Sequence, residues 1–265
     1  MRRQVPAGRR AGGRVPEGPA TRRVRERAPQ IPEDVSADQL DREARAELRT
    51  LPPDLADTVA RRLVAAELED DPGRAYAHAQ EARTLAARVG VVREVCGVAA
   101  YRAGLWAQAL SEFRAARRMT GRDDYLPVMA DCERALGRHD RALELAHSPE
   151  AARLSRAGQI EMRIVESGIR RDQGRPGAAV VVLQVPELTS GRLYPWSARL
   201  CYAYADALLE AGRADEAREA FARAAAADTA GETDAASRLA ELEGFTVSDL
   251  TPPGEGAGAA RPDAS

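Results

Sequence analysis

The sequence predicts an all-α protein, and three observations carry that prediction. Ala, Leu, Arg and Glu dominate the middle of the 265-residue chain, and these residues have favourable helix propensities. Apolar residues there recur at three- and four-residue spacing, which places them on one face of a helix, whereas strand-type alternation is nearly absent. Aromatic residues make up only 4% of the sequence, so Ala, Leu and Val have to build the core.

The first 35 residues form a basic arm that differs from the rest of the chain. They are rich in Arg, Gly and Pro and carry nine arginines against four acidic residues, a net charge of +5, whereas the remainder carries -7. Such a segment has too little apolar surface to offset its conformational entropy, so we expect residues 1–35 to be disordered. A basic arm on an acidic body can contact polyanions or fold back on its own domain.

Ordered structure is expected to begin near Ser36. Ser36 with Gln39 three residues later predicts a capping box at the start of a short amphipathic helix. Pro52 and Pro53 are expected to end that helix, because proline lacks the amide and restricts the residue before it. Asp54 is then expected to cap the next helix.

From residue 55 onward the predicted helices come in pairs. In the first pair, Asp71 is expected to be the N-cap and Pro72 the first helical residue of the second helix. A further amphipathic helix at 233–242 is expected to cover the open end, and residues 245–265 are expected to be disordered. The predicted pairs are 55–69 with 72–88, 91–103 with 105–119, 124–136 with 138–147, 159–173 with 176–184, and 196–211 with 214–228.

The turns inside these pairs recur with a nearly constant period. The clearest is Gly104, since glycine leaves a helix through a left-handed backbone without steric cost. An alanine follows each turn residue by five positions, and a second core position lies four residues further on. The turn residues are Asp70, Gly104, Gly137, Gly174 and Gly212, which are 34, 33, 37 and 38 apart, and the alanines are Ala75, Ala109, Ala142, Ala179 and Ala217.

This pattern resembles the tetratricopeptide repeat (TPR), a helix–turn–helix unit of about 34 residues. The resemblance covers residues 55–228, and the ordered part of the chain also resembles uncharacterised actinobacterial TPR proteins. The first unit lacks the turn glycine, and Pro176 replaces an aromatic residue in the fourth. The predicted fold is therefore a TPR-like helical solenoid over residues 36–244, with an irregular antiparallel bundle as the alternative.

The resemblance implies a function as well as a fold. Stacked repeats leave a concave groove lined mainly by the first helix of each pair, and TPR proteins usually hold a peptide or helix of a partner protein there. The family's carboxylate clamp uses Lys and Asn, which this sequence lacks entirely, so that mode is excluded in its usual form. We expect a polar groove with charges of both signs, formed by Glu94, Val98, Tyr101, Arg102, Asp131, Arg134, Arg171, Tyr202 and Asp206.

An enzyme is not predicted. Without Lys there is no P-loop lysine, Schiff base or Ser-Lys pair. The three histidines, His78, His139 and His147, have no metal-ligand spacing and are expected to be solvated or to cap helices. We therefore expect a non-catalytic scaffold with no cofactor and no metal.

Cysteine count and hydropathy indicate the compartment. Three widely spaced cysteines, Cys96, Cys132 and Cys201, argue against disulfides and are expected to be small buried hydrophobes in a reducing environment. No apolar run approaches the ~20 residues that span a bilayer. We expect a cytoplasmic protein without membrane contact.

A second functional hypothesis uses the basic arm. In it, the chain is a regulatory protein whose arm contacts nucleic-acid phosphates while the repeats bind another protein. Binding that falls steeply with salt, and is lost on deletion of residues 1–35, would favour this alternative. The arm lacks aromatic residues that could stack on bases, so a specific single-strand interaction is not expected.

Overall fold

The computed structural model describes residues 29–244, which contain twelve α-helices, three 3-10 turns and no strand. The all-α prediction is confirmed. Helix ends differ from the predicted ones by a few residues at most from residue 55 onward. The helices are α1 Arg42–Leu48, α2 Pro53–Leu68, α3 Pro72–Ala86, α4 Gly90–Arg102, α5 Trp106–Thr120, α6 Leu126–Ala135, α7 His139–Ala146, α8 Arg156–Asp172, α9 Pro176–Leu183, α10 Ser197–Glu210, α11 Ala214–Ala227 and α12 Ala235–Leu242.

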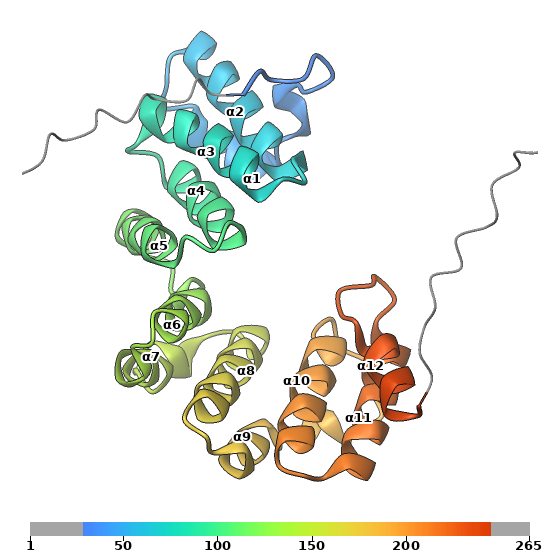
Figure 1. Cartoon of the computed structure of the whole chain (residues 1–265). Coiled ribbons are helices and arrows are strands. Elements are labelled where there is room, and N and C mark those ends of the chain that lie inside the picture. The colour runs from blue at the N-terminus through green and yellow to red at the C-terminus, as the bar shows by residue number, and fades with distance from the viewer. Residues whose placement is uncertain (1–28, 245–265) are drawn as a thin grey trace, which may run out of the picture.

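The helices form a row of hairpins that curves into an open arc (Figure 1). Within hairpins, α2 packs on α3, α4 on α5, α6 on α7, α8 on α9 and α10 on α11. Helices α4, α6, α8 and α10 lie on the inside of the arc, and α5, α7 and α9 lie on the outside (Figure 1). Second helices also pack on the first helix of the next hairpin, as α3 does on α4, α5 on α6 and α9 on α10, so the repeats shelter apolar surface of their neighbours.

The alanine column at the start of each second helix is fully buried in all five repeats. Ala75, Ala109, Ala142, Ala179 and Ala217 are all 0% exposed. A methyl side chain at this position lets the two helices of a hairpin approach closely, and in the second and fifth repeats an aromatic side chain four residues later fills the space beside it. Phe113 and Phe221 occupy that position in the second and fifth repeats and are both buried.

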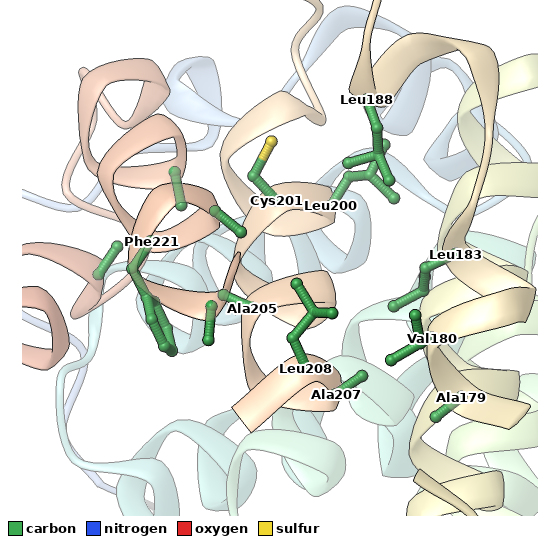
Figure 2. Packing of buried hydrophobic residues seen from close by; sticks show 14 of the residues in the cluster. Ala179, Val180, Leu183, Leu188, Leu200, Cys201, Ala205, Ala207, Leu208 and Phe221 are labelled. Carbon is green, nitrogen blue, oxygen red and sulfur yellow. The ribbon is translucent and has the colours of Figure 1, made fainter. Parts of the chain in front are cut away.

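The largest core cluster lies mainly between α9, α10 and α11, and in it α10 packs against both of its neighbours. In Figure 2, Leu208 on α10 points toward Val180 and Leu183 on α9, while Ala205 lies on the side nearer Phe221 of α11. Helix α10 therefore has apolar side chains on two faces, which a helix needs when it is packed between others.

The turn glycines adopt the conformation for which glycine is required. Gly104, Gly137, Gly174 and Gly212 have φ values of 69°, 72°, 69° and 76°. In each of these turns, the residue after the glycine donates its amide to a carbonyl five residues before it, as Leu105 does to Ala100 at 2.9 Å. Left-handed backbone of this kind closes the end of a helix and costs other L-residues conformational energy.

Replacing a turn glycine is expected to lower stability through this backbone alone. Gly104→Ala should cost about 1–2 kcal/mol of unfolding free energy, because a Cβ is unfavourable at positive φ. The matched control is Gly177→Ala within α9, where nothing lies within 4 Å of the added Cβ and the helix should gain about 0.5–1 kcal/mol. Urea unfolding of both variants measures the difference, and equal effects would contradict the turn assignment.

The N-terminal end differs in detail from the prediction. The capping box is present, with the Ser36 amide donating to Gln39 Oε1 at 2.8 Å. It opens a 3-10 turn, Ala37–Gln39, and α1 starts separately with Asp41 as its cap. The prediction that Asp54 caps α2 is wrong, because Pro53 is itself the first helical residue and Asp54 lies in the first turn. A proline at this position loses no hydrogen bond.

Residues 29–35 were assigned to the arm by composition, yet they contact the first repeat. Val35 is buried and Ile31 packs against the N-terminal core. The carbonyls of Pro29 and Val35 accept hydrogen bonds from Arg62 and Arg61 on α2. In the sequence, two apolar residues among prolines and charges were too weak a signal to predict this contact. The disorder predicted for residues 1–28 and 245–265 lies outside the described residues.

Candidate functional site

The inside of the arc contains a central hollow of about 590 Å³. Four first helices, α4, α6, α8 and α10, contribute side chains to it. Its apolar floor consists of short or branched side chains, and two tyrosines, Tyr101 and Tyr202, come from the helices at either end. The other lining residues are Asp124, Pro127, Val128, Asp131, Arg134, Gly158, Glu161, Ile164, Val165, Ser167, Gly168, Arg171, Arg199, Ala203 and Asp206.

A ladder of side-chain contacts runs along this face from one first helix to the next. Its donors are Tyr101, Arg134 and Arg171, which each lie three residues before the turn glycine of their repeat. Each reaches an acidic residue on the next first helix: Tyr101 bonds Asp131, Arg134 bonds Asp172 at 3.0 Å, and Arg171 bonds Asp206 at 3.3 Å and Glu210 at 2.5 Å. The acceptors lie two or six residues before the next turn glycine, so the ladder repeats with the fold.

The charged side chains that were expected to meet a partner pair with one another in this ladder instead. Asp131 also accepts from Arg134 at 2.8 Å, Asp206 also contacts Arg238 of α12 at 3.5 Å, and Glu161 pairs with Arg199 at 2.6 Å. The mixed signs of the groove are therefore complementary to one another within the chain. Arginine suits this role because its planar guanidinium can bond two acceptors at once.

The tyrosines of this face stay protonated. Burial raises the pKa of Tyr202 to about 12, with nearby carboxylates adding to the effect. Burial and the hydrogen bond to Asp131 raise the pKa of Tyr101. Burial likewise raises the pKa of the Glu161 carboxyl, although Arg199 opposes the shift. At neutral pH the two tyrosines are therefore uncharged hydroxyls, able to donate hydrogen bonds but not to act as bases.

A second, N-terminal hollow of about 320 Å³ lies between α1, α2 and α4. Glu47 of α1 accepts a hydrogen bond from the Val91 amide at 2.8 Å, which fixes α1 beside the start of α4. The floor is apolar and the rim is charged. The lining residues are Leu40, Asp41, Glu43, Ala44, Glu47, Ala66, Glu67, Val91, Glu94, Val95, Val98, Ala99, Arg102 and Arg122.

The structure divides the nine predicted groove residues between the two hollows. Glu94, Val98 and Arg102 line the N-terminal hollow. The other six, Tyr101, Asp131, Arg134, Arg171, Tyr202 and Asp206, line the central hollow. The prediction missed Glu161, Arg199 and the apolar floor around Ile164 and Val165. Their positions on the first helices at helical spacing could have indicated them, but the role of α1 had no sequence signal.

The two hollows are adjacent along the arc, and α4 and α6 are joined between them by side chains. Tyr125 at the start of α6 donates to Glu94 of α4 at 2.7 Å, and Tyr101 of α4 bonds Asp131 of α6. Burial and Glu94 raise the pKa of Tyr125 to about 12, so this donor also keeps its proton.

The side chains on this face make hydrogen bonds, ion pairs and apolar contacts. Among residues 29–244, no group of three or more His, Cys, Asp or Glu side chains is arranged to hold a metal ion.

His78 departs from the expectation of a solvated or capping role, because it is 1% exposed and its Nδ1 lies 2.9 Å from Arg62. The three cysteines are buried, as predicted. Within the described part of the chain, no helix has the length and hydropathy to span a membrane.

Comparison with known proteins gives matches at the level of structure. No family model and no curated protein matches the sequence. The fold is similar to that of TTC0263, described as a thermophilic TPR protein in Thermus thermophilus, with a TM-score of 0.54 and 18% identity over 71% of this chain and 100% of that chain. It also matches YrrB, described as a TPR protein with an unusual peptide-binding site, with a TM-score of 0.42 and 16% identity over 71% of this chain and 95% of that one.

The likeness to TTC0263 agrees with the features of the chain itself. Helical hairpins follow one another with a period near 34 residues, left-handed glycines close the turns of the second to fifth repeats, and a buried alanine column joins the two helices of each hairpin. The alternative of an irregular antiparallel bundle does not have this regular stacking. The chain therefore has the tetratricopeptide-repeat fold.

Proposed function

We propose that this chain is a non-catalytic protein-interaction scaffold, and that its repeat domain, residues 36–244, holds an extended peptide or helix of a partner protein in the central hollow. The observation that carries the proposal is the hollow itself. Four successive first helices contribute to a space of about 590 Å³ with an apolar floor and hydrogen-bonding walls. Binding sites in proteins are typically concave, largely apolar and lined by a few placed polar groups.

The ladder indicates which partner chemistry fits. Because the arginines and carboxylates already pair within the chain, a partner gains little from net charge. Apolar side chains are favoured instead, since the floor offers Val128, Ile164 and Val165. The proposed ligand is thus a segment with apolar anchors and few charges.

The same ladder dictates how the proposal should be tested. Reversing the charge of Arg134 or Arg171 breaks contacts between repeats, so any loss of binding could reflect altered stacking. Val165→Arg is preferable, because Val165 lies on α8 in the middle of the hollow and the arginine stem can extend into the open space. The matched control is Val181→Arg on α9, where the valine is 64% exposed and lines neither hollow.

A displayed library of random peptides, enriched on the full chain, supplies the ligands. We expect enriched peptides to bind Val165→Arg at least about 10-fold more weakly, since a centrally placed contact often dominates binding energy. Val181→Arg should bind them as the unaltered chain does. Circular dichroism melting confirms that both variants are folded. Peptides that bind both variants equally would show that the central hollow is not the binding site.

A further inference from the structure

The N-terminal hollow differs from the central hollow in its balance of charge. Five carboxylates, those of Asp41, Glu43, Glu47, Glu67 and Glu94, face two arginines, Arg102 and Arg122, a surplus of three negative charges. Among residues 29–244, the first four of these carboxylates form no ion pair. Glu94 forms a long one, with its carboxylate oxygen 3.7 Å from the Arg122 guanidinium. In the central hollow, by contrast, every carboxylate has an arginine partner.

The register of the repeats explains where this surplus comes from. The ladder donor lies three residues before each turn, and in the first repeat that position is Glu67 before Asp70. The acceptor positions six and two residues before Gly104 are Val98, which is 46% exposed, and Arg102, which donates to the Glu69 carbonyl at 3.1 Å. An acidic residue thus replaces the donor, and an apolar and a basic residue replace the acceptors. The carboxylate step of the ladder is therefore missing here, and the carboxylates of Glu43 and Glu67 are open, with no hydrogen bond or ion pair among residues 29–244.

The same chain carries a segment of complementary charge. Residues 1–28 contain nine arginines against Glu17 and Glu26, a net charge of +7. This segment joins the described structure at Pro29, whose carbonyl is held by Arg62 on α2. Arg62 lies one helical turn before Ala66, which lines the N-terminal hollow. The point of attachment is therefore on α2, the helix that contributes Ala66 and Glu67 to the hollow.

We propose that residues 1–28 of this chain bind in the N-terminal hollow, with arginines meeting the open carboxylates of Glu43 and Glu67. A random-coil segment of this length has a root-mean-square span of about 30 Å, enough to cover the hollow from Pro29. A tether of this kind gives an effective concentration in the millimolar range, so an affinity in that range is enough for the segment to occupy the hollow. A basic partner segment has to displace the arm before it can use this hollow.

This proposal does not depend on what the central hollow binds. A spin label on Ala11→Cys in the full chain tests it, since the three native cysteines are buried and remain unlabelled. We expect the amide signals of Val95, Val98 and Ala99 to broaden in the paramagnetic state. Glu43→Gln with Glu67→Gln should lower the binding constant of the segment about four-fold and so reduce the broadening, because each exposed ion pair is worth about two-fold in affinity.

The matched control removes two charges elsewhere. Glu144→Gln with Glu219→Gln alters exposed carboxylates of α7 and α11 that form no ion pair within residues 29–244, and should leave the broadening unchanged. Broadening that survives Glu43→Gln with Glu67→Gln, or that centres on Ile164 and Val165, would overturn the proposal. A mixture of spin-labelled and isotope-labelled chains distinguishes the remaining occupant, because broadening between chains would assign the hollow to the arm of a second copy.

Discussion

Phe113→Ala is expected to lower the unfolding free energy by about 3–5 kcal/mol, as large-to-small changes at buried aromatics do. Phe113 is 2% exposed and lies where three helices meet. Its ring packs against Gly97 of α4 and stacks on Tyr125 at the start of α6, with ring centroids 5.9 Å apart. Domains of this kind have only about 5–15 kcal/mol in total, so the second and third repeats should lose a large part of their stability.

Urea unfolding followed by circular dichroism measures this effect, with Val181→Ala as the control. Val181 is 64% exposed, so its truncation should change the free energy by no more than about 0.5 kcal/mol. A loss below about 1 kcal/mol on Phe113→Ala would contradict the assignment of the ring as the contact between α4, α5 and α6.

A second substitution, at Gly97, tests whether Gly97 and the Phe113 ring are in direct contact. A Cβ added at Gly97 would lie 2.9 Å from the Phe113 ring, so Gly97→Ala should destabilise the unaltered chain through overpacking. In the Phe113→Ala background that clash is absent, and the same substitution should stabilise α4 by about 1 kcal/mol through helix propensity. A change of sign between the two backgrounds identifies direct contact, whereas effects that simply add would show that Gly97 and Phe113 act independently.

The features that sequence could predict are those set by local rules. Gly104 and Gly212 were predicted from glycine's tolerance of positive φ, and Asp71 with Pro72 from helix capping, which the structure confirms through a 2.7 Å bond from the Arg74 amide to Asp71. Each of these depends on residues within a few positions of one another. Repetition then extended the local rule along the chain, because a period of about 34 residues fixes which positions face the same neighbour.

Features that depend on contact between distant residues were not predicted. Tyr101 and Asp131 were both expected at the groove, but nothing in their spacing indicated that they bond each other. His78 was expected to be solvated or to cap a helix, yet Arg62 from the facing helix gives it a partner inside the core. Pairing across helices is decided by the distance and angle between them, and patterns within a few residues of one another do not specify either.

Buried charge gives the second large effect. Glu133 on α6 is 1% exposed and has two partners, Arg114 of α5 at 2.6 Å and Arg138 before α7 at 3.3 Å. Arg114→Ala together with Arg138→Ala leaves this carboxylate without a counter-charge. We expect the unfolding free energy to fall by about 3–5 kcal/mol, because the desolvation cost of a buried ion is no longer offset.

A third substitution separates the buried charge from the loss of two side chains. Adding Glu133→Leu to the double variant removes the ion, and an apolar side chain at a fully buried position needs no partner. The triple variant should therefore regain at least about half of the lost stability. The exposed pair of Arg213 and Glu216 serves as the control, and Arg213→Ala should cost no more than about 1 kcal/mol.

The outcome also decides what holds the second and third repeats together. If the triple variant is no more stable than the double variant, the aliphatic stems of Arg114 and Arg138, and not their charges, hold α5, α6 and α7 together. If it recovers, the three helices are joined by a buried ion whose partners are 45% exposed at the surface. In that case the junction needs Arg114 and Arg138 only because Glu133 is charged, since an apolar residue at position 133 would tolerate the loss of both arginines.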